Sequence, residues 1–289
     1  MSSITLDNGI TIHPIQTGTV AIRKRQTDGA GRKRTSFARV LSDRNWTEPL
    51  PILTWLIEHP EGLILVDTGE TPRVKEPGYF TSWHPFFRLG LKEWVEPQEA
   101  VGAQIERLGF SREDVRYALV THFHTDHAGG INDLSASEII ASKKDYDYSK
   151  GFLGKARGFL PQHWPAGFAP RLIEFDDGPF GPFAASTTLT SAGDVHLVPT
   201  PGHTPGHFSV VVEDGDTALF FAGDTSYTEK LMLDGVVDGV SADVAAGHDS
   251  LARIQRLTAE RPTIYLPTHD PLAPARLARR QVTTAKAVV

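Results

Sequence analysis

The chain has 289 residues, of which 40% are hydrophobic, so it is long enough to bury a sizeable core. Its formal net charge of −6 argues against a nucleic-acid-binding protein at the level of the whole chain. The absence of cysteine excludes disulfides, thiolate metal ligands and a cysteine nucleophile, so any bound metal has to be held by His, Asp and Glu.

The N-terminal region, residues 1–45, is predicted to be an extension built of strands and a hairpin. Apolar and polar residues alternate from Ile4 to Val40, and residues 28–31, Asp-Gly-Ala-Gly, are typical of a turn. A basic cluster lies here, and we interpret it as a solvated hairpin rather than a nucleic-acid or nuclear-import patch, because the whole chain is acidic. Its members are Arg23, Lys24, Arg25, Arg32, Lys33 and Arg34.

The first residues lack the basic start and apolar segment of a signal peptide. No apolar run approaches the roughly 20 residues that a membrane helix needs. We therefore expect a soluble, cytoplasmic protein with no membrane and no nucleic-acid partner.

Strands and a few helices alternate along the rest of the chain. The run Leu63–Val66 is continuously apolar and is predicted to be buried on both faces. A helix with one apolar stripe is predicted to begin at Pro97 and to end near Gly109. Residues 71–96, rich in Pro and aromatic residues, and residues 143–170, loop-like from Gly151 to Pro170, are predicted surface excursions near the active site.

The remaining predicted elements favour a layered α/β (α+β) domain that spans residues 1–289. The other strands are expected at Ile52–Glu58, Tyr117–Val120, Glu138–Ala141, Arg171–Phe175, Val195–Val198, Ser209–Val212, Ala218–Ala222 and Thr263–Leu266, with a helix from about Ser250 to Ala259.

A histidine-rich motif follows the predicted buried strand that ends at Val120. Residues 122–127 read His-Phe-His-Thr-Asp-His. Side chains two apart in extended backbone point the same way, so His122 and His124 can converge on one metal. The chain must then turn, and Asp126 and His127 project toward a second point. One short loop thus offers ligands for two ions.

Further candidate ligands sit in loops that each follow an apolar strand, where a rigid scaffold commonly presents functional residues. His203 lies in Pro-Gly-His-Thr-Pro-Gly-His, Asp224 in Gly-Asp-Thr-Ser-Tyr, and His269 in Pro-Thr-His-Asp. His207, four residues after His203, is interpreted as stabilising its loop and not as a ligand.

These motifs resemble those of the metallo-β-lactamase superfamily, in the family's order, over the chain from Ile52 to His269. The resemblance implies an αββα four-layer sandwich with the metals at one edge. It implies that one ion is held by His122, His124 and His203, the other by Asp126, His127 and His269, and that Asp224 bridges them. Asp67, which closes a buried strand, resembles the family's carboxylate that orients a ligand imidazole.

Two divalent ions are the implied cofactors, with Zn expected and Co, Mn or Fe also compatible with imidazole and carboxylate ligands. A hydroxide held between them would attack a carbonyl. Asp126 is placed to donate or shuttle the proton that the leaving alkoxide needs.

Tyr227 narrows the substrate, since one helical turn would place it on the same side as Asp224, where its phenol could bind a substrate carbonyl. The run from Gly223 to Thr228 and the motif His-x-His-x-Asp-His-Ala-Gly-Gly resemble N-acyl-homoserine lactonases. The implied substrate is therefore a small lactone or ester, most closely an N-acyl-homoserine lactone, and the implied biological role is quorum quenching.

An acyl chain would need an apolar trough beside the metals. The aromatic and apolar residues of the two excursions are candidates for its walls, and equally for core or for a homodimer contact. They are Trp83, Phe86, Phe87, Phe152, Leu153 and Phe159.

Other functions remain open at this point. A thioesterase of glyoxalase-II type shares the metal motifs, but only about twenty residues follow His269, where that family carries a helical region. A metal-dependent phosphotriesterase or arylesterase would use the same bridged site. A β-lactamase proper is disfavoured because Asp224 is the implied bridging ligand. An RNA-processing nuclease is disfavoured because the whole chain is acidic. A non-catalytic binding module is disfavoured because the ligand set is complete.

Overall fold

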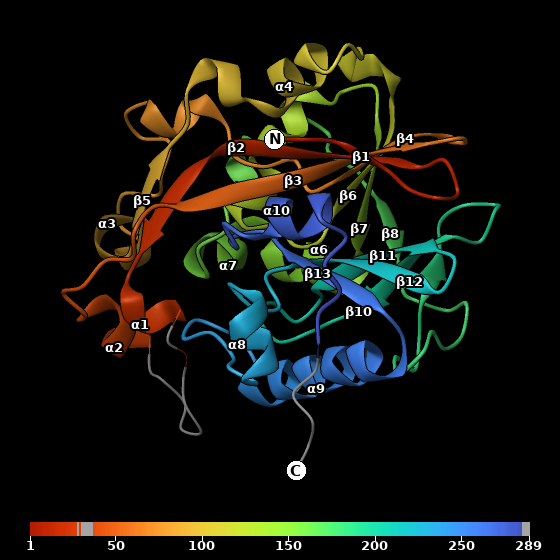
Figure 1. Ribbon diagram of the computed structural model, residues 1–289. Coiled ribbons are helices and arrows are strands. Elements are labelled where there is room, and N and C mark those ends of the chain that lie inside the picture. The colour runs from red at the N-terminus through yellow and green to blue at the C-terminus, as the bar shows by residue number, and fades with distance from the viewer. Residues whose placement is uncertain (28, 30–36, 285–289) are drawn as a thin grey trace.

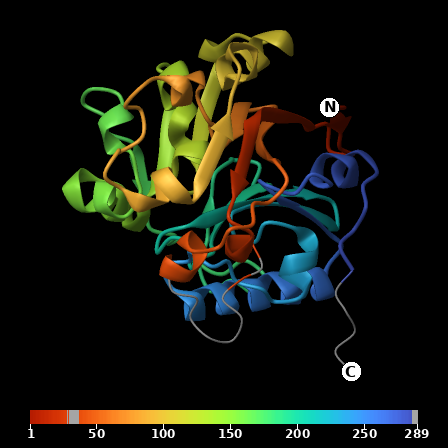
Figure 2. The same ribbon diagram turned by 90° about the vertical axis from the view of Figure 1, so that its left-hand side faces the viewer.

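The computed structural model describes residues 1–27, 29 and 37–284. In this part of the chain two β-sheets pack face to face, and helices cover the outer face of each sheet (Figures 1 and 2). The expected αββα sandwich is confirmed.

The first sheet is formed by the N-terminal half of the chain. Its order is β1-β2-β3-β4-β6-β7-β8, with β5 paired to β2. Strands β1 to β4 are antiparallel neighbours, whereas β4, β6, β7 and β8 run parallel. The strands are β1 (Ile4–Thr5), β2 (Thr11–Ile22), β3 (Leu50–His59), β4 (Gly62–Val66), β5 (Leu91–Trp94), β6 (Val115–Val120), β7 (Glu138–Ser142) and β8 (Arg171–Ile173).

The second sheet is formed by the C-terminal half. Its order is β13-β12-β11-β10-β9, and only the β12–β13 pair is parallel among these strands. The strands are β9 (Thr187–Thr188), β10 (Val195–Pro199), β11 (Phe208–Asp214), β12 (Thr217–Gly223) and β13 (Thr263–Pro267).

The main hydrophobic core lies between the sheets. Trp55 of the first sheet packs against Phe221 of the second, with ring centroids 5.4 Å apart. A second core lies under α4 (Val101–Arg107), which buries Val101 and Ile105 against the first sheet. A third lies under α9 (Val244–Glu260), which buries Ile254 against the second sheet. Each sheet thus has two apolar faces, as its continuous hydrophobic strands predict.

Most helices occupy the outer layers and the end of the sandwich where β5 lies, whereas the last helix packs through Ala273 and Leu277 against the core between the sheets. The α-helices are α1 (Lys24–Thr27), α2 (Phe37–Leu41), α3 (Pro85–Leu89), α4 (Val101–Arg107), α5 (Thr125–Ala128), α6 (Lys143–Ser149), α7 (Gly151–Ala156), α8 (Glu229–Leu233), α9 (Val244–Glu260) and α10 (Ala273–Ala278). Short 3₁₀ turns are η1 (Pro72–Lys75), η2 (Pro97–Glu99), η3 (Arg112–Asp114), η4 (Gly129–Asp133) and η5 (Pro161–His163).

The N-terminal prediction is right for β2 and wrong after it. Residues 24–27 and 37–41 are helical, not extended. The turn residues Asp28, Ala30 and Gly31 and the basic residues Arg32, Lys33 and Arg34 lie outside the described residues.

The excursions also hold more regular structure than predicted. Leu91–Trp94 is a strand, because its backbone pairs with β2 and extends the first sheet. Gly151–Ala156 is helical rather than loop. Helix α9 begins at Val244, before the predicted Ser250, because the Asp243 side chain caps it by accepting from the amides of Ala245 and Ala246. The helix after Pro97 forms as a 3₁₀ turn followed by α4.

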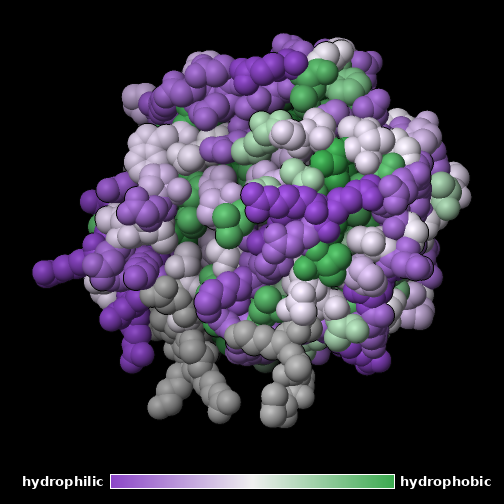
Figure 3. Space-filling view, viewed as in Figure 1, coloured by the Kyte–Doolittle hydropathy of each residue, from purple (hydrophilic) through white to green (hydrophobic). Residues whose placement is uncertain are grey.

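Within the described ranges, none of the helices has the length and apolar character needed to cross a bilayer. The face shown in Figure 3 is mainly hydrophilic, with hydrophobic residues in small separate patches. The homodimer stays a prediction.

Candidate metal centre

The histidine-rich loop leaves the end of β6 in extended conformation and then turns into α5. Phe123 points away from its histidine neighbours into the core, where its ring centroid lies 4.8 Å from that of Trp164. Asp126 and His127 lie on the turn of α5. The backbone thus carries His122 and His124 before the turn and Asp126 and His127 on it, while His122 also lies close to His127 and Asp224.

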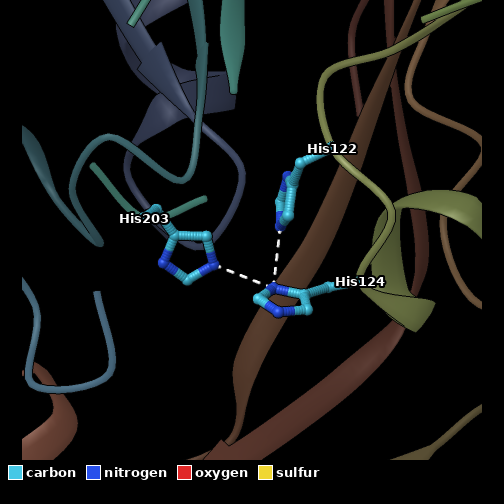
Figure 4. Close-up of side chains that lie close together, drawn as sticks. All are labelled: His122, His124 and His203. Atoms are coloured by element: carbon cyan, nitrogen blue, oxygen red, sulfur yellow. Dashed lines mark hydrogen bonds between the residues drawn. The ribbon is translucent and has the colours of Figure 1, made fainter. Parts of the chain in front are cut away.

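The histidine group consists of His122, His124 and His203, which lie close together (Figure 4). His122 Nε2 lies 3.0 Å from His124 Nδ1, and His124 Nδ1 lies 2.9 Å from His203 Nε2. His122 and His124 follow the first sheet, whereas His203 comes from the loop between β10 and β11 of the second.

The mixed group consists of Asp126, His127 and His269, whose ligand atoms lie within 4.8 Å of one another. Asp224, at the end of β12, lies between the two groups. Its Oδ2 is 3.5 Å from His203 Nε2, while its Oδ1 is 3.2 Å from His127 Nε2 and 3.4 Å from His269 Nε2. One carboxylate therefore faces both groups, one oxygen to each.

Buried partners orient three of the imidazoles through their other ring nitrogen. Nδ1 of His127 lies 2.8 Å from Asp67, Nδ1 of His203 lies 3.0 Å from Asp238, and Nδ1 of His269 lies 2.9 Å from the Pro51 carbonyl oxygen. Asp67 stands where the sequence predicts it.

The sequence reasoning missed Asp238 and Pro51. Asp238 carries no recognisable motif, and its only sequence signal is a short polar side chain before Gly239 in a turn.

The loop that carries Asp224 is held by His207. The Nε2 atom of His207 accepts a hydrogen bond from the backbone N–H of Asp224 at 3.0 Å. The Nδ1 atom of His207 lies 2.9 Å from the Thr200 hydroxyl. Both ring nitrogens of His207 are thus bonded within the protein, in keeping with a loop-stabilising residue.

The donor set fits divalent cations. His127 Nε2 and Asp224 Oδ1 are fully buried and, among the described residues, make no hydrogen bond of normal geometry, although they lie 3.2 Å apart. Buried polar atoms normally have partners, so such atoms point to a missing ligand. Neutral imidazoles and carboxylates are the ligands that Zn and related ions prefer.

The charge states of His122 and His124, two members of the histidine group, agree with this fit. Burial, together with the neighbouring imidazole of His203, lowers the pKa of His124 to about 3. Burial and the neighbouring histidines also lower the pKa of His122. Both rings are therefore neutral at physiological pH, which is the form that binds a metal ion.

Comparison with known proteins assigns the family. A family model described as the metallo-beta-lactamase superfamily matches residues 47–269. The chain belongs to this superfamily. The match runs from just before β3 to the last histidine of the mixed group, so it contains every residue of both groups.

The curated relatives within the superfamily share only moderate sequence identity with this chain. The "probable metallo-hydrolase Rv2300c" of Mycobacterium tuberculosis is 35% identical over 187 residues, which are 62% of this chain and 58% of that protein. The chain thus matches little more than half the length of this relative. An N-acyl homoserine lactonase of Bacillus cereus is 28% identical over 227 residues, 76% of this chain and 82% of that protein.

A solved structure shares the whole superfamily fold. The crystal structure of a variant of Bacillus thuringiensis AiiA, with N-decanoyl-L-homoserine bound at its active site, superimposes with a TM-score of 0.70 and 21% identity. The superposition covers 94% of this chain and 96% of that chain. At this identity the likeness establishes the fold.

A cavity of about 300 Å³ opens beside both ligand groups. Tyr227 lines it, and its ring stacks on His269 with a centroid distance of 5.4 Å. The segment between Asp224 and Tyr227 is a loop and not the predicted helical turn, but Tyr227 still reaches the side of the metal ligands.

The predicted apolar walls divide into two sets. Phe86, Phe87 and Phe159 line the cavity. Trp83 and Phe152 stack on each other at the surface, 54% and 74% exposed, and Leu153 is also exposed. The trough therefore has aromatic walls, but only part of the predicted set forms them.

Asp145, at the start of α6, supports the metal loop from behind. Its buried Oδ2 accepts the Phe123 backbone N–H at 2.9 Å. We expect Asp145→Ala to lower the free energy of unfolding by about 1–3 kcal/mol, because this amide loses its partner in a buried setting. Urea unfolding measures the change. Asp147→Ala, which removes an exposed carboxylate on the same helix, is the control and should cost under about 1 kcal/mol. Equal losses in the two variants would contradict the expectation.

Glu70 and Glu93 form a pair of buried carboxyl groups, of which Glu93 lines the cavity. Glu70 Oε1 accepts from the Thr71 amide and the Tyr79 hydroxyl, at 2.8 and 3.3 Å. Glu93, on β5, lines the cavity, and neither of its oxygens makes a hydrogen bond of normal geometry to a described residue. Burial raises the pKa of Glu70 to about 7, and burial together with Glu70 raises the pKa of Glu93 well above its ordinary value.

This pair predicts a pH-dependent stability. Above the ordinary pKa of 4.5, the unfolded chain releases the Glu70 proton while the folded protein retains it until about pH 7. The contribution of Glu70 to stability is therefore full at low pH and is lost as the pH rises through this window. Between pH 5 and pH 8 the wild type should lose about 3 kcal/mol more than Glu70→Gln, measured by urea unfolding with a chelator present. Parallel curves for the two proteins would contradict the assignment.

Proposed function

We propose that the chain is a metal-dependent hydrolase that holds two divalent ions, with Zn expected, and opens the ring of an N-acyl-homoserine lactone. The observation that carries the proposal is the position of Asp224, with one oxygen facing the histidine group and the other facing the mixed group, beside a cavity lined by Tyr227. The naming of relatives as N-acyl homoserine lactonases supports the substrate class.

In this proposal the histidine group would hold one ion, the mixed group would hold the other, and Asp224 would serve both groups. Bound there, such ions would polarise a carbonyl oxygen and lower the pKa of a water molecule. Asp67 and Asp238 keep the rings of His127 and His203 in the orientation that this binding requires.

The chain's own residues then manage the carbonyl and the protons. Tyr227 would donate a hydrogen bond to the ring carbonyl oxygen, where negative charge develops. Burial and the nearby Asp224 raise the pKa of this phenol well above its ordinary value, so it keeps its proton. Asp126 lines the same cavity, and its Oδ2 lies 3.3 Å from His269 Nε2. In this proposal its carboxylate carries a proton during the reaction.

The reaction balances without another reactant. The oxygen of one water molecule bonds to the ring carbonyl carbon, and the ring C–O bond breaks. One water proton passes by way of Asp126 to the departing alkoxide, and the second is released from the new carboxylic acid. The net release of one proton makes the reaction visible in a pH-stat.

The test is ring opening of hexanoyl- and decanoyl-homoserine lactone by protein loaded with Zn or Co. Tyr227→Phe should lower kcat by about 10²-fold, because a donor to the developing oxyanion is lost. Tyr117→Phe, a phenol on β6 outside the cavity lining, is the matched control and should retain wild-type turnover.

No lactone turnover by protein that holds two ions would refute the substrate assignment. Thioesters, phosphotriesters and aryl esters would then be assayed with the same preparation, because the same ligand arrangement serves those reactions.

A further inference from the structure

Gln26, on α1, places a buried amide against the cavity beside Tyr227. Gln26 is buried, with 4% of its surface exposed, and it lines the cavity. Its Nε2 donates to the Tyr227 hydroxyl at 2.7 Å. Its Oε1 is buried and has no hydrogen-bond partner among the described residues. The N-terminal segment, far from the metal motifs in sequence, thus contributes a polar group to the site.

The direction of this hydrogen bond matters for Tyr227. A phenol hydroxyl has one proton to donate and can also accept. Since the hydroxyl oxygen accepts from Gln26, its own proton stays available for another acceptor. On one side of Tyr227 the cavity wall is apolar, formed by Val20, Ile22 and Leu91, and these side chains offer no acceptor for that proton. A carbonyl oxygen brought in by a substrate is therefore a natural partner for that proton.

The Oε1 atom of Gln26 is a buried acceptor without a partner among the described residues. A buried acceptor without a partner costs free energy, which a ligand N–H that reaches it would recover. The glutamine amide thus places an acceptor for an N–H next to a phenol that donates to a carbonyl. In a lactone with an acylamino group on the carbon beside its carbonyl, the carbonyl oxygen and the amide N–H lie two carbon atoms apart. Such a substrate offers an N–H to the glutamine oxygen and a carbonyl oxygen to the phenol, whose hydroxyl is hydrogen-bonded to the same glutamine amide.

We propose that Gln26 is a positioning and specificity-determining residue that directs the Tyr227 proton toward the substrate carbonyl and binds the amide N–H of an α-acylamino lactone. The inference rests on the proposed lactone hydrolysis and assigns recognition of the substrate amide to Gln26. Gln26 acts on the substrate amide directly and on the reacting carbonyl through Tyr227.

The experiment compares two substrates of equal chain length: an N-acyl-homoserine lactone and an α-alkyl-γ-butyrolactone that lacks the amide. Gln26→Met keeps the side-chain length but has neither donor nor acceptor. We expect KM to rise about tenfold for the amide substrate alone, the loss of one buried hydrogen bond. We expect kcat to fall about tenfold for both substrates. In a Tyr227→Phe background, Gln26→Met should cause no further fall in kcat.

Gln26→Glu has nearly the same shape and serves as the test if the methionine variant folds poorly. An ionised carboxylate there would accept the Tyr227 proton, so kcat should fall for both substrates. Gln255→Met, on α9 and away from the cavity lining, is the matched control and should behave as wild type. Equal KM changes for both substrates, or full additivity of the Gln26 and Tyr227 variants in kcat, would overturn the inference. Failure of the wild type to open either lactone would instead refute the proposed function.

Discussion

Asp224→Asn is expected to lower kcat for lactone opening by at least about 10³-fold and to reduce the bound metal to about one ion per chain. The carboxylate oxygens lie 3.5 Å from His203 Nε2 and 3.2 Å from His127 Nε2, so each ligand group receives one of them. Asparagine is neutral and replaces one of these oxygens with an amide NH₂, which repels a cation. Two closely spaced dications need an anion between them.

The measurement is metal content by mass spectrometry after dialysis, followed by turnover of the same sample. Asp216→Asn is the control, because it changes an exposed carboxylate at the opposite end of β12. Two retained ions with turnover within tenfold of wild type would show that Asp224 does not join the two groups.

Asp67→Ala should have the largest effect on stability. The buried Asp67 carboxylate accepts from the Thr121 backbone N–H at 2.8 Å and from its hydroxyl at 3.0 Å, and it lies 2.8 Å from His127 Nδ1. Removing one partner of a buried polar pair costs about 3–5 kcal/mol. Asp67 also has a φ of 61°, a conformation that Asp tolerates better than Ala.

Thermal unfolding measures this loss, and a fall in Tm of about 6–15 °C is expected for a chain of this size. Asp67→Asn retains the backbone preference and should cost less stability, while metal affinity still falls about 10–100-fold. Asp176→Ala, an exposed aspartate after β8, is the control. An unchanged Tm for Asp67→Ala would mean that the carboxylate does not organise the loop.

The sequence was most informative where function depends on local spacing. His122, His124, Asp126 and His127 share one short loop, so extended backbone followed by a turn largely determines how they diverge. The strands beneath them are continuously apolar, which allows their burial to be predicted from the sequence.

The parts that escaped prediction depend on contacts between distant segments. Glu93 lies in an aromatic-rich stretch that carries no strand pattern of its own, and it becomes a cavity residue because β5 pairs with β2. Asp238 and Gln26 lie in segments without motifs, and only the folded chain brings them to His203 and Tyr227. Helix α9 begins before the residue that its apolar stripe predicts, because the residues after its cap, Asp243, form an Ala-rich turn that carries no apolar stripe.

The separation of the two sheets along the chain has a mechanical consequence. Residues up to Ile173 build the first sheet and residues from Thr187 build the second, yet each ligand group draws side chains from both. Any ion bound there is therefore a reversible cross-link between two halves of the polypeptide that are otherwise joined mainly by their shared core. Because the ion binds only when the two halves are together, a higher free concentration of the ion stabilises their association by mass action. Under a pulling force applied across the two halves, the rupture force should consequently follow the metal supply, falling when a chelator is added and returning when the ion is restored.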